Sequence, residues 1–190
     1  MGGRSWVHLT HGAPNLRYAP AMARSNGEHL RLLLIRHADA GDPAEWTGPD
    51  AERPLSERGI KQAARLAAAL HASGASIDRL IASPARRCGE TAAILGEALG
   101  LEVSVEQALA DGPRLAELRR IVDDGSSCVA LVGHEPHLST LAGELTGIAG
   151  LPVPKGTMVR IDLPRPLAAG GGTLAWVAPP SLFRSPKGER

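Results

Sequence analysis

Aromatic residues and cysteine are scarce in this sequence. Phe, Tyr and Trp together make up 3% of its 190 residues. The hydrophobic core must therefore be built from Ala, Leu, Val and Ile, the small and branched residues that most often fill protein interiors. The only two cysteines are Cys88 and Cys128, which are too few for the disulfide framework of a small secreted domain.

The sequence also lacks a strong excess of charge and a long apolar run. Its formal net charge is +1, which argues against general binding to nucleic acid or to a membrane surface. No stretch approaches the roughly 20 apolar residues that span a bilayer, and the N-terminus has no apolar centre of the signal-peptide kind. We therefore expect a cytoplasmic protein that binds neither nucleic acid nor membrane, and the sequence does not indicate its oligomeric state.

Length and composition predict one domain. A chain of 190 residues with 43% hydrophobic content can bury one substantial core but is short for two. Residues 1–29 are rich in Gly, Pro, Asn and Arg and show no periodicity, so we expect an N-terminal extension that is partly disordered. The domain is predicted to span residues 30–180, followed by a loose tail over residues 181–190.

Within this domain, short aliphatic runs alternate with helical patterns. The run "LRLLLIR" at 30–36 is typical of a strand covered on both faces. Ser56 and Ser83 stand where N-caps would open two of the helices. Strands separated by helices favour a mostly parallel sheet with helices on both faces. We predict an α/β fold of three layers, α/β/α, with a mostly parallel central sheet.

Basic and polar side chains follow three of the predicted strands. Arg36 and His37 end the first strand, Ser83 and Arg86 follow the second, and His134 follows the run "CVALVG". Ligands of such sheets bind at the carboxyl edge, where parallel strands end. We therefore expect two arginines and two histidines to meet at this edge.

This set of residues suits an oxyanion better than a metal ion. Guanidinium groups repel cations, and no cluster of acids or thiols accompanies them, so we expect neither a metal ion nor another cofactor. Arginine forks match phosphate oxygens and keep their charge near neutral pH. A histidine between two arginines should have a pKa below about 6.5, which leaves a neutral ring nitrogen free to attack phosphorus.

Four ordered motifs resemble those of the histidine phosphatase (phosphoglycerate mutase-like) superfamily. They are "RHADA", "PLSERG", "SPARR" and "VGHEP", and the resemblance covers about residues 31–178. It implies a phosphoglycerate mutase-like fold and a hydrolase of phosphoric monoesters or phosphoramidates. The "RHADA" form, the short core and "GHEP" are most similar to the small SixA-type phosphohistidine phosphatases.

The resemblance also implies roles for individual residues. His37 would be the phosphorylated nucleophile, Arg36 and Arg86 the phosphate clamp, and His134 the second histidine of the pocket. Ser83 would join Arg36, Arg86 and His134 in binding the substrate.

The sequence departs from the mutase-like branch in lacking its proton-donating glutamate. The corresponding stretch "ALADGPRL" contains no Glu, and the candidates for a general acid are Asp39, Asp111 and Glu135. An imidazole leaves readily once it is protonated near neutral pH, so a phosphoramidate substrate needs a dedicated acid less than an ester does.

The leading hypothesis is a metal-independent phosphatase that acts on protein phosphohistidine through a phosphohistidine intermediate. The alternatives are a phosphatase of a small phosphorylated metabolite, a phosphoglycerate-type mutase and a non-catalytic phosphate-binding module. The predicted partner is accordingly a phosphorylated protein or a small phosphorylated metabolite.

Overall fold

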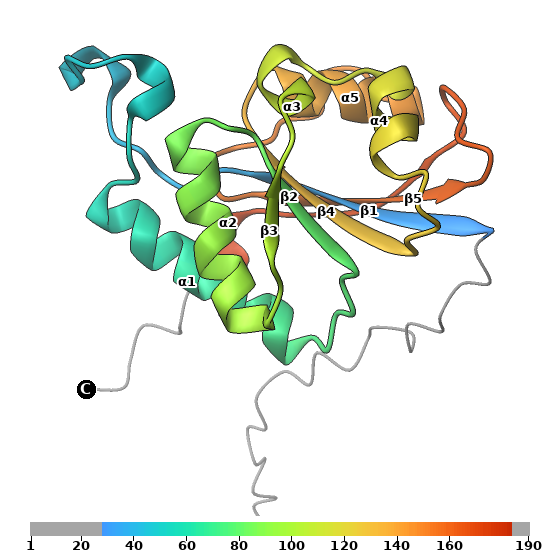
Figure 1. The fold of residues 1–190 in the computed structure, drawn as a ribbon, viewed down its shortest axis with the longest axis horizontal. Helices are drawn as coiled ribbons and strands as arrows, with labels where there is room; N and C mark the ends of the chain where they lie inside the picture. Colours follow the sequence, from blue (N-terminus) through green and yellow to red (C-terminus); the bar gives the residue numbers. More distant parts are fainter. Residues whose placement is uncertain (1–27, 184–190) are drawn as a thin grey trace, which may run out of the picture.

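The computed structural model describes residues 28–183, which form a single six-stranded sheet flanked by helices (Figure 1). The strand order is β3-β2-β4-β1-β5-β6. The strands are β1 (His29–Arg36), β2 (Arg79–Ala82), β3 (Val103–Val105), β4 (Cys128–Gly133), β5 (Met158–Pro164) and β6 (Thr173–Ala178). Two predictions fall outside the described residues. The partly disordered N-terminal extension falls on residues 1–27, and most of the loose C-terminal tail falls on residues 184–190.

The sheet is mixed, with its parallel part at the centre. Strands β3, β2, β4 and β1 run parallel, whereas β5 pairs antiparallel with both β1 and β6. Strand β4 is buried at every residue, as expected for a strand covered on both faces. The prediction of a mostly parallel sheet within an α/β fold is confirmed.

Helices cover both faces of the sheet, and their apolar sides pack on separate halves of the core. They are α1 (Glu57–Ala72), α2 (Arg86–Leu99), α3 (Ala108–Asp111), α4 (Leu115–Ile121) and α5 (His137–Thr146), with three 3-10 turns, η1 (Pro43–Glu45), η2 (Asp50–Glu52) and η3 (Pro180–Phe183). Helices α1 and α2 lie on one face, and α3, α4 and α5 lie on the other.

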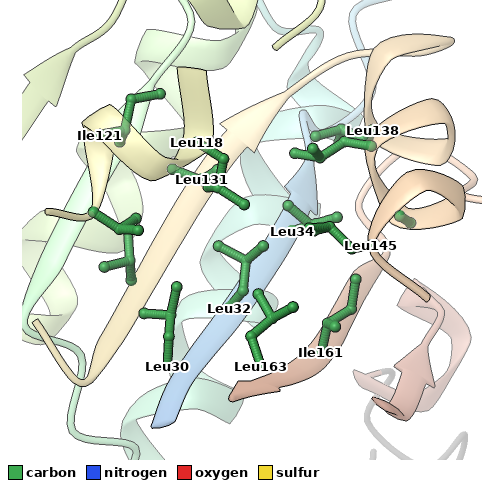
Figure 2. Packing of buried hydrophobic residues seen from close by; sticks show 14 of the residues in the cluster. Leu30, Leu32, Leu34, Leu118, Ile121, Leu131, Leu138, Leu145, Ile161 and Leu163 are labelled. Atoms are coloured by element: carbon green, nitrogen blue, oxygen red, sulfur yellow. The ribbon is translucent and has the colours of Figure 1, made fainter. Parts of the chain in front are cut away.

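Strand β1 divides its side chains between these two halves. Leu32 and Leu34 face α4 and α5 (Figure 2), whereas Leu33 and Ile35 pack on the side of α1 and α2. Because alternate side chains of a strand point to opposite faces, a run of apolar residues is needed to fill both halves. The result is a rigid strand whose last residue, Arg36, reaches the edge of the sheet.

Two predicted helix starts had different outcomes. Ser56 is the N-cap of α1, and its hydroxyl accepts a hydrogen bond from the Gly59 amide at 3.1 Å. The prediction of Ser83 as the N-cap of α2 is wrong, because the cap is Ala85 and the helix begins at Arg86. The short helix α3 was not predicted from the sequence.

Candidate active site

Three neighbouring parallel strands end at the same edge of the sheet, as the sequence predicted. His37 follows β1, Ser83 follows β2 and His134 follows β4, which lies between them. The backbone ties these ends together, since the His37 amide donates to the Gly133 carbonyl and the Ser83 amide donates to the Val132 carbonyl, both at 2.9 Å. The strands therefore fix the positions from which the side chains extend.

The His37 ring is buried and oriented by its own backbone turn. Only 3% of the residue is exposed, and Nδ1 lies 2.7 Å from the Ala38 carbonyl oxygen. Because a carbonyl oxygen only accepts hydrogen bonds, we assign the proton to Nδ1 and the lone pair to Nε2. Burial lowers the pKa of His37 to about 3; the hydrogen bond to Ala38 opposes this shift, and the charges of Arg87, Arg36 and His134 add to it.

Arg87 is the arginine of α2 that faces His37. Its side chain is buried, and its Nε donates to His37 Nε2 at 3.3 Å. Thr91 connects the backbone that follows His37 to the backbone of α2. Its hydroxyl accepts a hydrogen bond from the Ala38 amide at 3.1 Å and donates one to the Arg87 carbonyl at 2.7 Å. The first turns of α2 therefore hold both the nucleophile candidate and its guanidinium partner.

The structure does not bring Arg86 to the site, which corrects the prediction for this residue. Its side chain is 56% exposed and pairs with Glu90 at 2.7 Å, because consecutive residues of a helix point about 100° apart. The signal for the right residue was present in the sequence. Counted from Ser83, the Ser-Pro-x-x-Arg pattern ends at Arg87.

Arg36 completes the cationic side of the site. Its Nη1 donates to the Val153 carbonyl at 2.8 Å, whereas its Nε is buried and has no hydrogen-bond partner among the described residues. Burial lowers the pKa of the Arg36 guanidinium, the charge of Glu135 raises it, and Arg87 lowers it again. A buried donor without a partner is available to an oxyanion.

His134 is half-buried and packs edge-on against His137, with ring centroids 4.8 Å apart and planes at 71°. Burial and the neighbouring His137 lower the pKa of His134, which favours a neutral ring near pH 7. Ser83, by contrast, is fully buried and accepts a hydrogen bond from the Ala85 amide at 3.4 Å. The structure therefore does not expose Ser83 for direct substrate binding.

The three acid candidates occupy different environments. Asp39 accepts hydrogen bonds from Gly41 and Ser56; burial raises its pKa, but these bonds and the charges of Lys155 and Arg58 outweigh burial and lower it. Asp111 is exposed at the end of α3.

Glu135 is the candidate whose charge acts on Arg36. Its Oε2 accepts from Ser139 at 2.5 Å, and its Oε1 is buried without a partner among the residues described. Glu135 is therefore the acid candidate whose carboxylate lies beside the cationic side of the site.

The low pKa of His37 predicts a pH dependence of stability. Between its folded value of about 3 and its ordinary value of 6.5, the unfolded chain binds a proton that the folded chain does not. The stability that the neutral His37 ring contributes is therefore fully present above pH 6.5 and is lost as the pH falls toward 3. From this residue alone, the unfolding free energy should fall by on the order of 2 kcal/mol between pH 7 and pH 5.

Urea unfolding of the wild type and of His37→Gln at both pH values measures this effect. The variant should lose less stability on acidification, because its side chain does not titrate. Equal losses in the two proteins would contradict the burial of a neutral His37.

A neutral imidazole that faces buried guanidinium groups is suited to accept a phosphoryl group, and this chemistry places the chain among phosphate-transferring α/β proteins.

Within the described residues, no group of three or more His, Cys, Asp or Glu side chains is placed to hold a metal ion. In the same part of the chain, no helix is long and apolar enough to cross a membrane.

Comparison with known proteins identifies the family within this class. Residues 32–112 match the family model of the histidine phosphatase superfamily, branch 1. An uncharacterized protein of Picosynechococcus sp. is 34% identical over 118 residues, which cover 60% of this chain and 71% of that protein. The phosphohistidine phosphatase SixA of Escherichia coli is 27% identical over 168 residues, which cover 83% of this chain and 99% of SixA.

Solved structures with a similar fold also include a SixA protein. The structure of the protein histidine phosphatase SixA complexed with tungstate has a TM-score of 0.72 at 24% identity, covering 82% of this chain and 100% of that one. A structure described as a putative alpha-ribazole-5'-P phosphatase of Escherichia coli has a TM-score of 0.63 at 21% identity, covering 80% and 97%. The chain belongs to the histidine phosphatase superfamily, a family of phosphatases, and it is SixA-like. The predicted fold and family are confirmed.

Proposed function

We propose that this phosphatase dephosphorylates protein phosphohistidine and that His37 carries the phosphoryl group between the two half-reactions. The observation that supports this most is the buried, neutral His37 ring, whose Nε2 faces Arg87 while Nδ1 is held by Ala38. A ring nitrogen with a lone pair and a fixed orientation is the form of histidine that attacks phosphorus.

The reaction proceeds in two displacements. In the first, Arg87 Nε releases His37 Nε2, whose lone pair forms a bond to phosphorus. The bond from phosphorus to the leaving group breaks, and its electron pair stays with the leaving group. In the second, water attacks phospho-His37 and releases orthophosphate, and Nε2 regains its lone pair. Arg36, Arg87 and His134 stabilise the charge on the phosphoryl oxygens in both steps.

The environments of the acid candidates support a P–N substrate. Asp39 has a lowered pKa and is ionised near neutral pH, and Asp111 is exposed at a helix end. An imidazole leaving group is protonated near neutral pH without a buried acid. Glu135 is the residue we assign to any proton transfer that the leaving group needs.

The surroundings of the site support a protein substrate. Between α2 and α5 lie only β3, the short helices α3 and α4, and β4, without an inserted subdomain. SixA of Escherichia coli, a relative that this chain matches along most of its length, is a phosphohistidine phosphatase.

A small phosphorylated metabolite is the second candidate substrate. Solved structures with the same fold include one described as a putative alpha-ribazole-5'-P phosphatase. The cytoplasm stays the predicted compartment for either substrate.

The deciding experiment compares kcat/KM for one protein phosphorylated on histidine with that for the same protein phosphorylated on serine. A panel of sugar and glycerate phosphates and a chelator control complete the assay. We expect at least a tenfold preference for the phosphohistidine protein and full activity with chelator. A preference for any small ester would overturn the proposed substrate while leaving the His37 chemistry intact.

A further inference from the structure

The loop between β1 and α1 holds the far end of the Arg87 side chain. Nη2 of Arg87 pairs with the Asp50 carboxylate at 2.9 Å, and Nη1 donates to the Asp50 backbone carbonyl at 2.6 Å. The third nitrogen, Nε, donates to His37 Nε2. One residue of an exposed loop therefore binds both terminal nitrogens of the guanidinium that faces the nucleophile.

Asp50 is itself anchored to the chain that follows His37. Its second carboxylate oxygen accepts from Arg53 Nε at 2.9 Å, and the Arg53 side chain is only 8% exposed. Arg53 Nη1 in turn donates to the Ala40 carbonyl at 2.8 Å. The carboxylate thus bridges two buried arginines and links the turn η2 to the segment directly after the active-site strand.

This geometry restricts how Arg87 can turn. A guanidinium is planar, so two hydrogen bonds at Nη1 and Nη2 determine the direction in which the Nε–H bond points. Without the Asp50 carboxylate, the buried Arg87 would lose its counter-ion and one of the two bonds that fix its plane, and only the Asp50 backbone carbonyl would still hold Nη1. We propose that Asp50 is a positioning residue that holds Arg87 Nε beside His37 Nε2, from where it passes to an oxygen of the incoming phosphoryl group. This role rests on the function proposed above.

Asp50 does not have the properties of a proton donor. Burial raises its pKa, but the hydrogen bonds and charges of Arg53 and Arg87 outweigh burial and lower it. The carboxylate could instead compete with phosphate for Arg87, and this alternative predicts the opposite sign in the experiment below. Loss of a competitor would strengthen oxyanion binding, whereas loss of a positioning residue would weaken it.

The test is a double-mutant cycle that combines Asp50→Asn with Arg87→Lys. The assay measures kcat/KM for p-nitrophenyl phosphate and the inhibition constant of orthophosphate. We expect Asp50→Asn to lower kcat/KM about tenfold and to weaken orthophosphate binding in the wild-type background. In the Arg87→Lys background the same change should cost less than twofold, because the group that Asp50 positions is already gone.

Glu52→Gln is the matched control, since it lies on the same turn and removes the same charge. The Glu52 side chain makes no hydrogen bond or ion pair among the described residues, and the backbone bond from its amide to Pro49 is kept in the variant. Its activity should stay within twofold of the wild type. If Asp50→Asn does not fold, Asp50→Glu replaces it; this variant keeps the charge, and we expect it to lose severalfold in the wild-type background only.

Equal losses in both backgrounds, no loss at all, or tighter orthophosphate binding would each overturn the role of Asp50. If the wild type hydrolyses neither the aryl phosphate nor phosphohistidine, the proposed function fails instead. Hydrogen exchange of the Arg87 Nε–H, measured by NMR, then still tests the positioning. Faster exchange in Asp50→Asn than in Glu52→Gln supports it, and equal exchange contradicts it.

Discussion

Replacing His37 with alanine should lower kcat by on the order of 10⁴-fold or more, as expected when a covalent nucleophile is removed. His37 supplies the ring nitrogen that we assign to phosphorus, and no other histidine is hydrogen-bonded to Arg87 among the residues described. The measurement is the steady-state turnover of an aryl phosphate by purified wild type and variant.

The loss should not come from unfolding. The backbone bonds of His37, from its amide to Gly133 and from Gly156 to its carbonyl, do not involve the ring. Thermal unfolding should therefore stay cooperative in the variant. His71→Ala, which removes an exposed histidine on α1, is the matched control and should keep full activity. A folded His37→Ala protein with more than about one-hundredth of wild-type kcat would contradict the assignment.

The two neighbouring arginines of α2 should differ sharply. Arg87→Lys should lower kcat/KM by about 10² to 10³, the range seen when one donor to an oxyanion is removed. Lysine keeps the charge but cannot bind His37, the phosphoryl group and Asp50 with one planar group. Arg86→Lys should change kcat/KM by less than twofold, since Arg86 is exposed and paired with Glu90.

Both variants are measured with the same substrate, and their unfolding free energies are compared by urea denaturation. Arg87→Lys should lose some stability as well, because the buried Arg87 side chain is bonded to Asp50 and His37. Similar kinetic losses in the two variants, or a larger loss in Arg86→Lys, would show that the geometry around His37 is assigned wrongly.

The fold and the place of the site could be predicted from the sequence because both depend on local patterns. Apolar runs such as the one that ends at Arg36 have the length and composition of buried strands, and parallel strands end at one edge. Polar residues directly after these strands, such as His37 and His134, are therefore expected to lie close together at that edge. The cap at Ser56 was predictable for the same reason, since it depends on the sequence of one helical turn.

Details that depend on helix phase and tertiary contact could not be predicted in the same way. Helix α2 begins at Arg86, whereas a cap at Ser83 would have begun it at Pro84. The choice of Arg87 over Arg86 did not depend on this phase, since the Ser-Pro-x-x-Arg pattern counted from Ser83 already ends at Arg87. The loop that contains Asp50 has no periodicity, so its contact with Arg87 arises only when α2 packs beside it. Ser83 occupies a predicted site position, but its burial beside the Ala85 amide is a property of the folded chain.

The most direct test of a His37-centred mechanism is to trap the phosphorylated enzyme. Wild type, His37→Ala and Arg86→Lys are mixed with a ³²P-labelled phosphohistidine protein and quenched within one turnover. The account predicts a labelled phosphatase in the wild type and in Arg86→Lys, stable in base, lost in acid and located by peptide mapping at His37, with no label in His37→Ala. Turnover without a labelled intermediate, or label retained in the His37→Ala protein, would contradict it.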